Sequence, residues 1–126
     1  MNAAAYVRTA RPNCEEQEAQ TSRLIGYAKA HGLSLLSIQC DTCSGVTLQR
    51  PGLERLIRAA KKHEIKAVLV CKLDRLARDP MVLQQICDLL SREGVTLISS
   101  QEDASLLPVL RQFHQLAIRT SQSVSD

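Results

Sequence analysis

The sequence predicts an α/β fold: a mostly parallel four-stranded sheet in βαβαβαβα order with helices on both faces. Short apolar runs rich in β-branched residues alternate with longer segments whose apolar residues recur at helical spacing. Strands joined by crossover helices pair in parallel, and a parallel sheet is covered on both sides. Because 126 residues suffice for one hydrophobic core, residues 1–126 are expected to form a single domain.

The first half of the chain contains two predicted strand–helix pairs. Residues 3–8, "AAAYVR", are a short apolar run, and a helical pattern follows over residues 15–31. Gly32 suits the end of that helix, because glycine tolerates the left-handed conformation often found there. Residues 33–40 form the second predicted strand. Pro51 then opens an amphipathic helix, since proline fits the first helical turn.

The second half repeats this alternation. Residues 65–71, "IKAVLVC", form the third predicted strand. Asp79 and Pro80 have the residue types of an N-cap and of the first residue of a helix. Residues 95–100 form the fourth strand, and a last helix is predicted over residues 109–120. The order of elements therefore supports the parallel sheet.

Composition excludes several classes of function. Aromatic residues make up 2% of the chain and tryptophan is absent, which argues against a surface that stacks bases or sugars. A net charge of +3 is too small for a general polycation. There are, however, eleven arginines against five lysines, and the planar guanidinium suits bidentate contact with phosphate.

The cysteines and the hydropathy bear on localisation. Five cysteines are an odd number, and the sequence has neither a signal-peptide pattern nor an apolar run of membrane-spanning length. A cytoplasmic protein without a membrane partner is therefore expected.

Cations follow three of the predicted strands, and the topology brings them to one edge of the sheet. In open parallel sheets, ligands bind outside the carboxyl ends of the strands. That edge receives Arg8, Arg50, Lys72, Arg75 and Arg78. One arginine there is more often solvated or paired with an acid, but several that converge predict a polyanion site. Because the sequence has neither GxGxxG nor a Walker pattern, a phosphodiester backbone fits better than a nucleotide.

The spacing of two arginines adds detail to this site. Arg75 and Arg78 are three residues apart, so a helical loop would project both from one face towards a single phosphate. Both are expected to be exposed. Asp74 lies beside them and is placed to orient a guanidinium.

Three segments closely resemble the catalytic domain of the serine site-specific recombinases, the resolvase and invertase family. They are "YVRTA" in the first predicted strand, "CSGVTLQRPGLERLI" after the second and "VLVCKLDRLARDP" at the third. The likeness covers about residues 3–101, and the combination of "RPGLERL" with "KLDRLAR" is highly specific. The segment "EEQEAQ" also resembles the family and puts Gln20 at the position of its site glutamine.

The resemblance implies DNA strand cleavage and exchange. In the family, a serine hydroxyl attacks a DNA phosphodiester, forms a phosphoserine link and releases a 3′ hydroxyl, with arginines rather than a metal or cofactor supplying positive charge. The arginines that would surround the scissile phosphate are Arg8, Arg50, Arg75 and Arg78. Lys72 would add a phosphate contact, Asp74 would orient an arginine, and Gln20 would hydrogen-bond nearby. The implied partners are DNA and a second copy or another recombinase, in dimers or tetramers, for DNA integration and mobile elements.

At the nucleophile position the chain departs from the family. The family pattern reads Tyr, any residue, Arg, any residue, Ser, whereas this chain runs from Tyr6 to Ala10. A methyl group cannot attack phosphorus, so the domain is expected to be catalytically disarmed. Thr9 would point to the opposite side of the strand, and Ser44, in a loop, would lose the benefit of orientation if it were misplaced.

Two origins of Ala10 stay open. The chain is either a natural relative that has lost cleavage, or it carries a residue introduced to trap an uncleaved state; further departures after residue 100 favour the first. The separate DNA-reading domain of the family is not expected within residues 1–126. Recognition of a particular sequence would then need a partner, because phosphate contacts do not specify bases.

Three other interpretations of the sequence are less well supported. Cys40 and Cys43 form a CxxC pair that, with Cys14 and Cys71, would offer four thiolates to zinc, but a single CxxC is a weak signal. A response-regulator-like domain is disfavoured, because clustered acids for Mg²⁺ are missing from this edge. The last helix would suit a regulatory partner of an active recombinase, although such apolar stripes are more often core. The stripe consists of Leu110, Phe113, Leu116 and Ala117.

Overall fold

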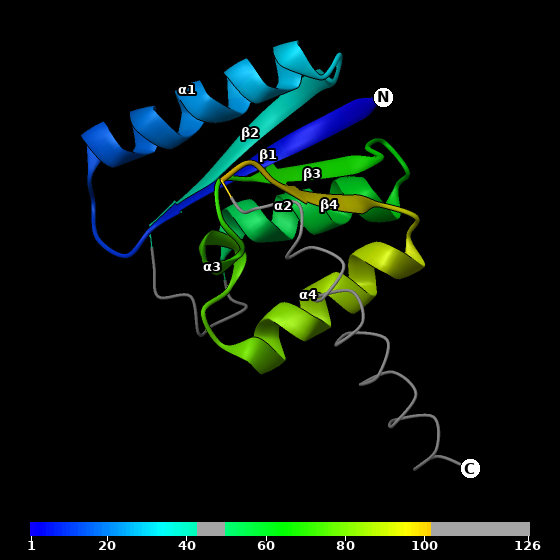
Figure 1. The fold of residues 1–126 in the computed structure, drawn as a ribbon. Coiled ribbons are helices and arrows are strands. Elements are labelled where there is room, and N and C mark those ends of the chain that lie inside the picture. Colours follow the sequence, from blue (N-terminus) through cyan, green and yellow to red (C-terminus); the bar gives the residue numbers. More distant parts are fainter. Residues whose placement is uncertain (43–49, 102–126) are drawn as a thin grey trace.

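A computed structural model of the chain describes residues 1–42 and 50–101. These residues form a four-stranded parallel sheet in the order β2-β1-β3-β4, with helices on both faces as the sequence predicts (Figure 1). The strands are β1 (Asn2–Thr9), β2 (Ser34–Thr42), β3 (Ala67–Val70) and β4 (Thr96–Ser99). The helices are α1 (Cys14–Ala30), α2 (Pro51–Lys61), α3 (Leu73–Leu76) and α4 (Pro80–Arg92).

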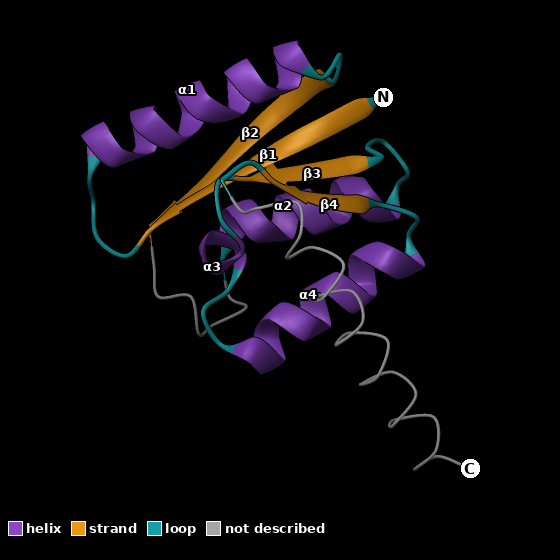
Figure 2. Ribbon diagram, viewed as in Figure 1, coloured by secondary structure: helices purple, strands orange, loops and turns teal. Residues whose placement is uncertain are grey.

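The described helices divide between the two faces of the sheet. Helix α1 covers one face, and α2, α3 and α4 lie on the other (Figure 2). The central strand β1 contributes side chains to the apolar cores on both faces, because successive side chains of a strand point to opposite sides. Those that pack towards α1 are Ala3, Ala5 and Val7. Those that pack towards the other three helices are Ala4 and Tyr6. An apolar β1 is therefore required along most of its length.

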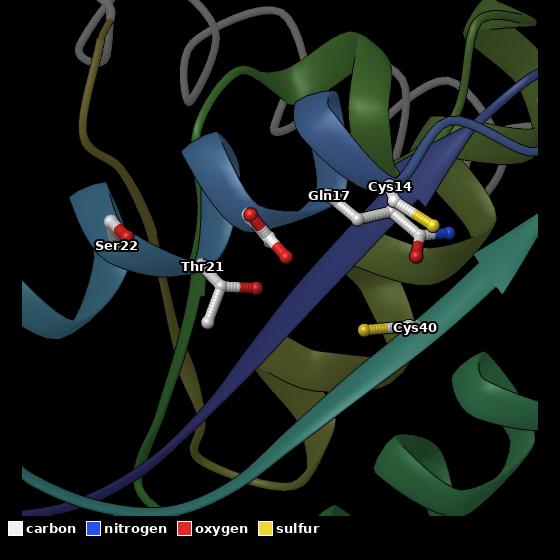
Figure 3. A pocket seen from close by; sticks show the side chains of 6 residues that line it. Cys14, Gln17, Thr21, Ser22 and Cys40 are labelled. Carbon is white, nitrogen blue, oxygen red and sulfur yellow. The ribbon is translucent and has the colours of Figure 1, made fainter.

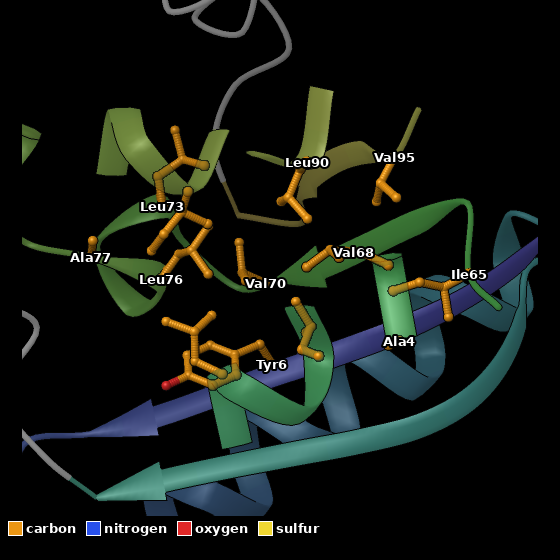
Figure 4. Close-up of a cluster of buried hydrophobic side chains, with 14 residues drawn as sticks. Ala4, Tyr6, Ile65, Val68, Val70, Leu73, Leu76, Ala77, Leu90 and Val95 are labelled. Carbon is orange, nitrogen blue, oxygen red and sulfur yellow. The ribbon is translucent and has the colours of Figure 1, made fainter. Parts of the chain in front are cut away.

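The larger apolar core lies between the sheet and helices α2, α3 and α4 (Figure 4). Val68 and Val70 of β3 belong to it, as do Leu73 and Leu76 of α3. A helix of four residues is not stable by itself, so these two leucines fix α3 by packing. The short helix is thereby held beside the carboxyl ends of the strands.

Several predicted boundaries are confirmed and others shift slightly. The Asp79 side chain accepts a hydrogen bond from the backbone N–H of Met81 (2.8 Å), and Pro80 is the first residue of α4, as predicted. Gly32 has a positive φ of 66° just after α1. The third strand is shorter than the predicted residues 65–71 and covers only Ala67–Val70. The predicted last helix and its apolar stripe lie outside the described residues.

The register leaves room for α3 at the end of β1. Strand β2 pairs along the whole of β1, whereas β3 pairs only with residues 3–5. Residues 6–9 therefore extend past the end of β3, and α3 contacts β1 there. Strands β2 and β3 also lie on opposite sides of β1, which is the arrangement at which open parallel sheets bind ligands. No helix in the described part of the chain is long and apolar enough to cross a membrane.

Candidate phosphate-binding site

Arg8 lies near the carboxyl end of β1, and its side chain is fully buried. It shares the face of Tyr6, since the two residues are two apart on a strand. The guanidinium Nε donates to the carbonyl of Arg75 (2.9 Å), and Nη2 donates to the carbonyl of Asp74 (2.5 Å). A β1 side chain thus satisfies carbonyls at the end of α3.

Arg50 is the residue immediately before α2, and it is also fully buried. Its Nη2 donates to the carbonyl of Leu76 (2.5 Å), and its guanidinium carbon lies 5.5 Å from the centre of the Tyr6 ring. Within residues 1–42 and 50–101, its Nε and Nη1 have no hydrogen-bond partner.

Three successive carbonyls of α3 therefore bind two guanidinium groups. The last carbonyls of a helix have no partner within the helix and carry partial negative charge. The two arginines come from segments 42 residues apart in sequence, Arg8 and Arg50. They fix the end of α3, and α3 in turn fixes them.

Positive charges are close enough at this edge to affect one another. Burial lowers the pKa of the Arg8 guanidinium, and neighbouring cations lower it further, while Tyr6 acts in the opposite direction. The cations are Arg50, Arg78 and Arg75. The structure therefore brings together the four arginines that the sequence analysis assigned to one edge.

The outer cations have a different environment. The Arg75 side chain is 26% exposed and pairs with Glu16 of α1, with 3.0 Å between Nη2 and Oε1. A second, longer contact of 3.8 Å joins Arg75 Nε to Asp74 Oδ1. Arg78 and Lys72 are exposed. Lys72 directly precedes α3.

Two expectations about the outer arginines are wrong. Helix α3 ends at Leu76, and Ala77 is extended with φ −160° and ψ 141°. Arg75 and Arg78 therefore do not project from one helical face. Arg75 is half-buried rather than exposed, because the carboxylate of Glu16 holds its guanidinium against α1.

Ala10 and Gln20 flank the end of β1. Ala10 directly follows the strand and is exposed. Thr9 is buried and accepts a hydrogen bond from Gln17 of α1 (3.4 Å), so it lies on the side opposite to Arg8, as expected. Gln20 is buried too. Its Nε2 donates to the backbone carbonyl of Arg8 (3.2 Å), and this contact reaches the Arg8 backbone rather than its guanidinium.

Asp41 supports the site, a role that was not predicted from the sequence. Its carboxylate accepts hydrogen bonds from the Tyr6 hydroxyl (2.7 Å) and from the backbone N–H groups of Gly52 (2.8 Å) and Leu53 (2.9 Å). These N–H groups belong to the first turn of α2. The Arg50 side chain makes no capping bond there, so Asp41 caps the helix from β2.

Gly52 is required by this close approach. A Cβ at that position would lie 2.9 Å from Asp41 Oδ2. The sequence signal was available: an arginine cannot cap a helix, so the first turn after it needs an acceptor from elsewhere. Glu16 was missed as well, and the only signal for it was an acid in the first turn of a helix.

The cysteines do not converge on one point in the described chain. Cys14 and Cys40 line an open hollow of about 420 Å³ between α1 and β2, together with Gln17, Glu18, Thr21 and Ser22 (Figure 3). Cys71 is instead buried at the end of β3, where its thiol lies 3.6 Å from the Gln20 carbonyl. Cys43 and Ser44 lie outside the described residues. Within residues 1–42 and 50–101, no group of three or more His, Cys, Asp or Glu side chains could hold a metal ion.

The fold and the arginine edge define a class of protein, and comparisons agree with it. A family model described as the N-terminal domain of resolvase matches residues 3–122. The chain therefore belongs to this family and is a serine-recombinase-type catalytic domain, a class that acts in DNA recombination and assembles as oligomers. A comparison with curated proteins gave no match.

Solved structures share the fold. The N-terminal catalytic domain of TP901-1 integrase matches over 100% of both chains with a TM-score of 0.82 and 26% identity. The C-terminal catalytic domain of ISC1926 TnpA, an IS607-like serine recombinase, has a TM-score of 0.76 and 23% identity, covering 98% of this chain and 86% of the other. A resolvase family site-specific recombinase from Streptococcus pneumoniae has a TM-score of 0.70 and 20% identity, covering 99% and 93%. The last two likenesses bear on the fold alone.

Proposed function

We propose that this domain binds the phosphodiester backbone of DNA at the carboxyl edge of its sheet and, with alanine at position 10, does not cleave it. The observation that carries the proposal is the meeting of four arginines from three separate crossovers at one edge. Guanidinium groups match the oxygens of a phosphate, and their charge favours an anion over any neutral ligand. The aromatic-poor composition agrees with contacts to the backbone rather than to bases.

The outer cations make the first contacts in this proposal. Lys72 and Arg78 are exposed, and Arg75 reaches a phosphate by exchanging its contact with Glu16. An exposed or half-exposed ion pair is weak, so this exchange costs about 1 kcal/mol or less.

The inner pair acts in a second step. Arg8 and Arg50 are fully buried, and their donors are directed at the carbonyls of residues 74–76. In the described arrangement they contribute electrostatic attraction without touching the ligand. Direct contact requires α3 to shift, so that phosphate oxygens replace its carbonyls as acceptors. Two nitrogens of Arg50 that have no partner in the described part of the chain favour this exchange, because an anion would supply acceptors for them.

The role of position 10 follows from the chemistry of the class. A serine there would form an Oγ–P bond while the bond from phosphorus to the 3′ oxygen breaks, with the serine proton ending on the released 3′ hydroxyl. Ala10 has no atom that can form this bond. Gln20 supports the strand end through the Arg8 carbonyl, and Asp74 contributes its carboxylate beside Arg75.

The test is Ala10→Ser, measured as covalent protein–DNA adduct on a denaturing gel with end-labelled duplexes of pooled sequence. We expect an adduct with the serine variant and none with the parent chain, and we expect both proteins to bind DNA with affinity that falls steeply as salt rises. The control is Ala10→Ser combined with Arg78→Ala, which should reduce the adduct. An adduct from the parent chain, or binding that ignores salt, would refute the proposal. No adduct from either chain would refute the view that position 10 is the only missing part.

A further inference from the structure

The positive charge of the chain is concentrated in one segment. Residues 50–66 contain six lysines and arginines and two glutamates, a net charge of +4, whereas the whole chain has +3. The other 109 residues therefore sum to −1. Helix dipoles explain only part of this excess. The last turns of α1 and α4 each carry a single base, whereas α2 carries two there and further lysines follow.

Five of these cations form an exposed ridge. The buried residues of α2 are Gly52, Leu53, Leu56 and Ala60, and the cations occupy its remaining surface and the loop that follows. We call this surface the α2 ridge; it consists of Arg55, Arg58, Lys61, Lys62 and Lys66. Residues 55, 58 and 62 follow the spacing of one helical face. Within the described residues, none of the five forms an ion pair.

One member of the ridge, Arg55, is hydrogen-bonded to the sheet. Arg55 Nε donates to the side-chain oxygen of Gln39 on β2 (2.7 Å). This bond leaves the terminal nitrogens of Arg55 for another acceptor. For the other four cations, no such side-chain bond is formed with residues 1–42 or 50–101.

The ridge is continuous with the candidate phosphate site. Helix α2 begins directly after Arg50, at the carboxyl edge, and as a crossover helix it runs back towards the opposite edge of the sheet (Figure 1). Its 11 residues correspond to about 16 Å at 1.5 Å per residue. One DNA strand carries a phosphate about every 3.4 Å along the duplex axis, so the helix spans roughly four or five phosphates.

We propose that the α2 ridge is a second contact surface for the DNA backbone, along which a duplex engaged at the arginine edge continues. The proposal rests on the proposed function for the identity of the ligand. Cations that form no ion pair in the described chain, in a line that starts at a phosphate site, match a polyanion of regular charge spacing better than a compact acidic patch. The ridge contributes affinity without sequence preference, because it offers phosphate contacts only.

The test compares two double variants by fluorescence anisotropy with a labelled 30-base-pair duplex of arbitrary sequence, over a range of salt concentrations. Arg58→Ala with Lys62→Ala removes two charges from the ridge. Lys29→Ala with Arg92→Ala removes two exposed charges from α1 and α4 and is the matched control. We expect the slope of log affinity against log salt to fall by about 2 in the ridge variant, because each lost phosphate contact contributes roughly 0.9. The control should change it little.

Equal slopes for the two double variants would overturn the ridge as a DNA surface. So would a ridge variant that loses binding to polyglutamate while its DNA affinity matches that of the control, since the occupant would then be an acidic protein segment. Arg78→Ala separates this result from the proposed function. If only the ridge assignment is wrong, Arg78→Ala still weakens DNA binding; if the arginine edge is wrong, Arg78→Ala has no effect while the ridge variant still lowers the slope.

Discussion

The cations at the carboxyl edge form two layers that differ in their surroundings. The inner layer, Arg8 and Arg50, is fully buried and bound to backbone carbonyls. The outer layer, Lys72, Arg75 and Arg78, is exposed or half-buried. The arginines of this edge thus differ in their surroundings: Arg8 and Arg50 are bound to the backbone of α3, whereas Arg75 and Arg78 are accessible at the surface.

The difference also explains why buried charge is tolerated here. A guanidinium inside a protein is costly unless its donors are satisfied. The free carbonyls at the end of α3 supply acceptors that carry partial negative charge. These carbonyls stabilise the inner layer in part, since two nitrogens of Arg50 have no partner within the described residues. Arg75 is instead paired with the carboxylate of Glu16.

The largest expected effect separates the layers by stability. Arg50→Ala removes a buried side chain, opens a cavity beside Tyr6 and leaves the Leu76 carbonyl without its partner. We expect a loss of about 3 kcal/mol in the free energy of unfolding. Arg78→Ala, at an exposed position, should change it by less than about 0.5 kcal/mol. Urea denaturation of the two variants measures both values.

Arg50→Met is the control for this comparison. Methionine keeps most of the volume and removes a charge of which two nitrogens lack a partner among the described residues, so it should cost clearly less than alanine. If Arg50→Ala and Arg78→Ala cost the same, the division into two layers is wrong.

A smaller effect tests what supports the inner layer. Asp41→Ala removes the cap of α2 and the acceptor of the Tyr6 hydroxyl, and we expect a loss of about 2 kcal/mol. Gly52→Ala should also destabilise, because its Cβ would press on the Asp41 carboxylate. In the double variant the Asp41 carboxylate is missing, so the Cβ at position 52 meets no clash. The stability loss of the double variant should therefore be about 1 kcal/mol smaller than the sum of the two single losses. Strict additivity in urea denaturation would show that the approach of Asp41 to Gly52 does not matter.

Much of the fold could be predicted because each signal is local. The cap at Asp79 and the first helical residue at Pro80 follow from the chemistry of those two residues alone. The meeting of arginines at one edge follows from a general rule for parallel sheets, applied to residues that come directly after strands. Neither inference needs knowledge of packing.

The rest depends on contacts between distant segments. Nothing near Arg8 in sequence indicates that its guanidinium ends on carbonyls of residues 74 and 75. The separation of Arg75 from Arg78 depends on where α3 stops, and the burial of Leu73 and Leu76 determines that. Asp41 caps a helix that begins ten residues later, so its partner is set by the β2–α2 packing.

The half-buried Cys87 on α4 shows how another kind of ionisable group avoids a charge inside the protein, and it gives the smallest predicted effect. Burial, with a contribution from Asp88, raises the pKa of this thiol to about 11. A thiol avoids burying a charge by keeping its proton, which an arginine cannot do in a protein. In the unfolded chain the thiol has a pKa of about 8.5.

The folded chain therefore holds a proton on Cys87 between about pH 8.5 and 11 that the unfolded chain releases. The contribution of this proton to the free energy of unfolding is fully present below about pH 8.5, and it is lost as the pH rises towards 11. We expect Cys87→Ala to lose about 1 kcal/mol less unfolding free energy than the parent between pH 8 and 9.5. Urea midpoints of both chains at the two pH values measure this difference. An equal loss in both chains would mean that the Cys87 thiol ionises as easily in the folded chain as in the unfolded one. The surroundings of Cys87 would then tolerate a charge, as the surroundings of Arg8 and Arg50 do.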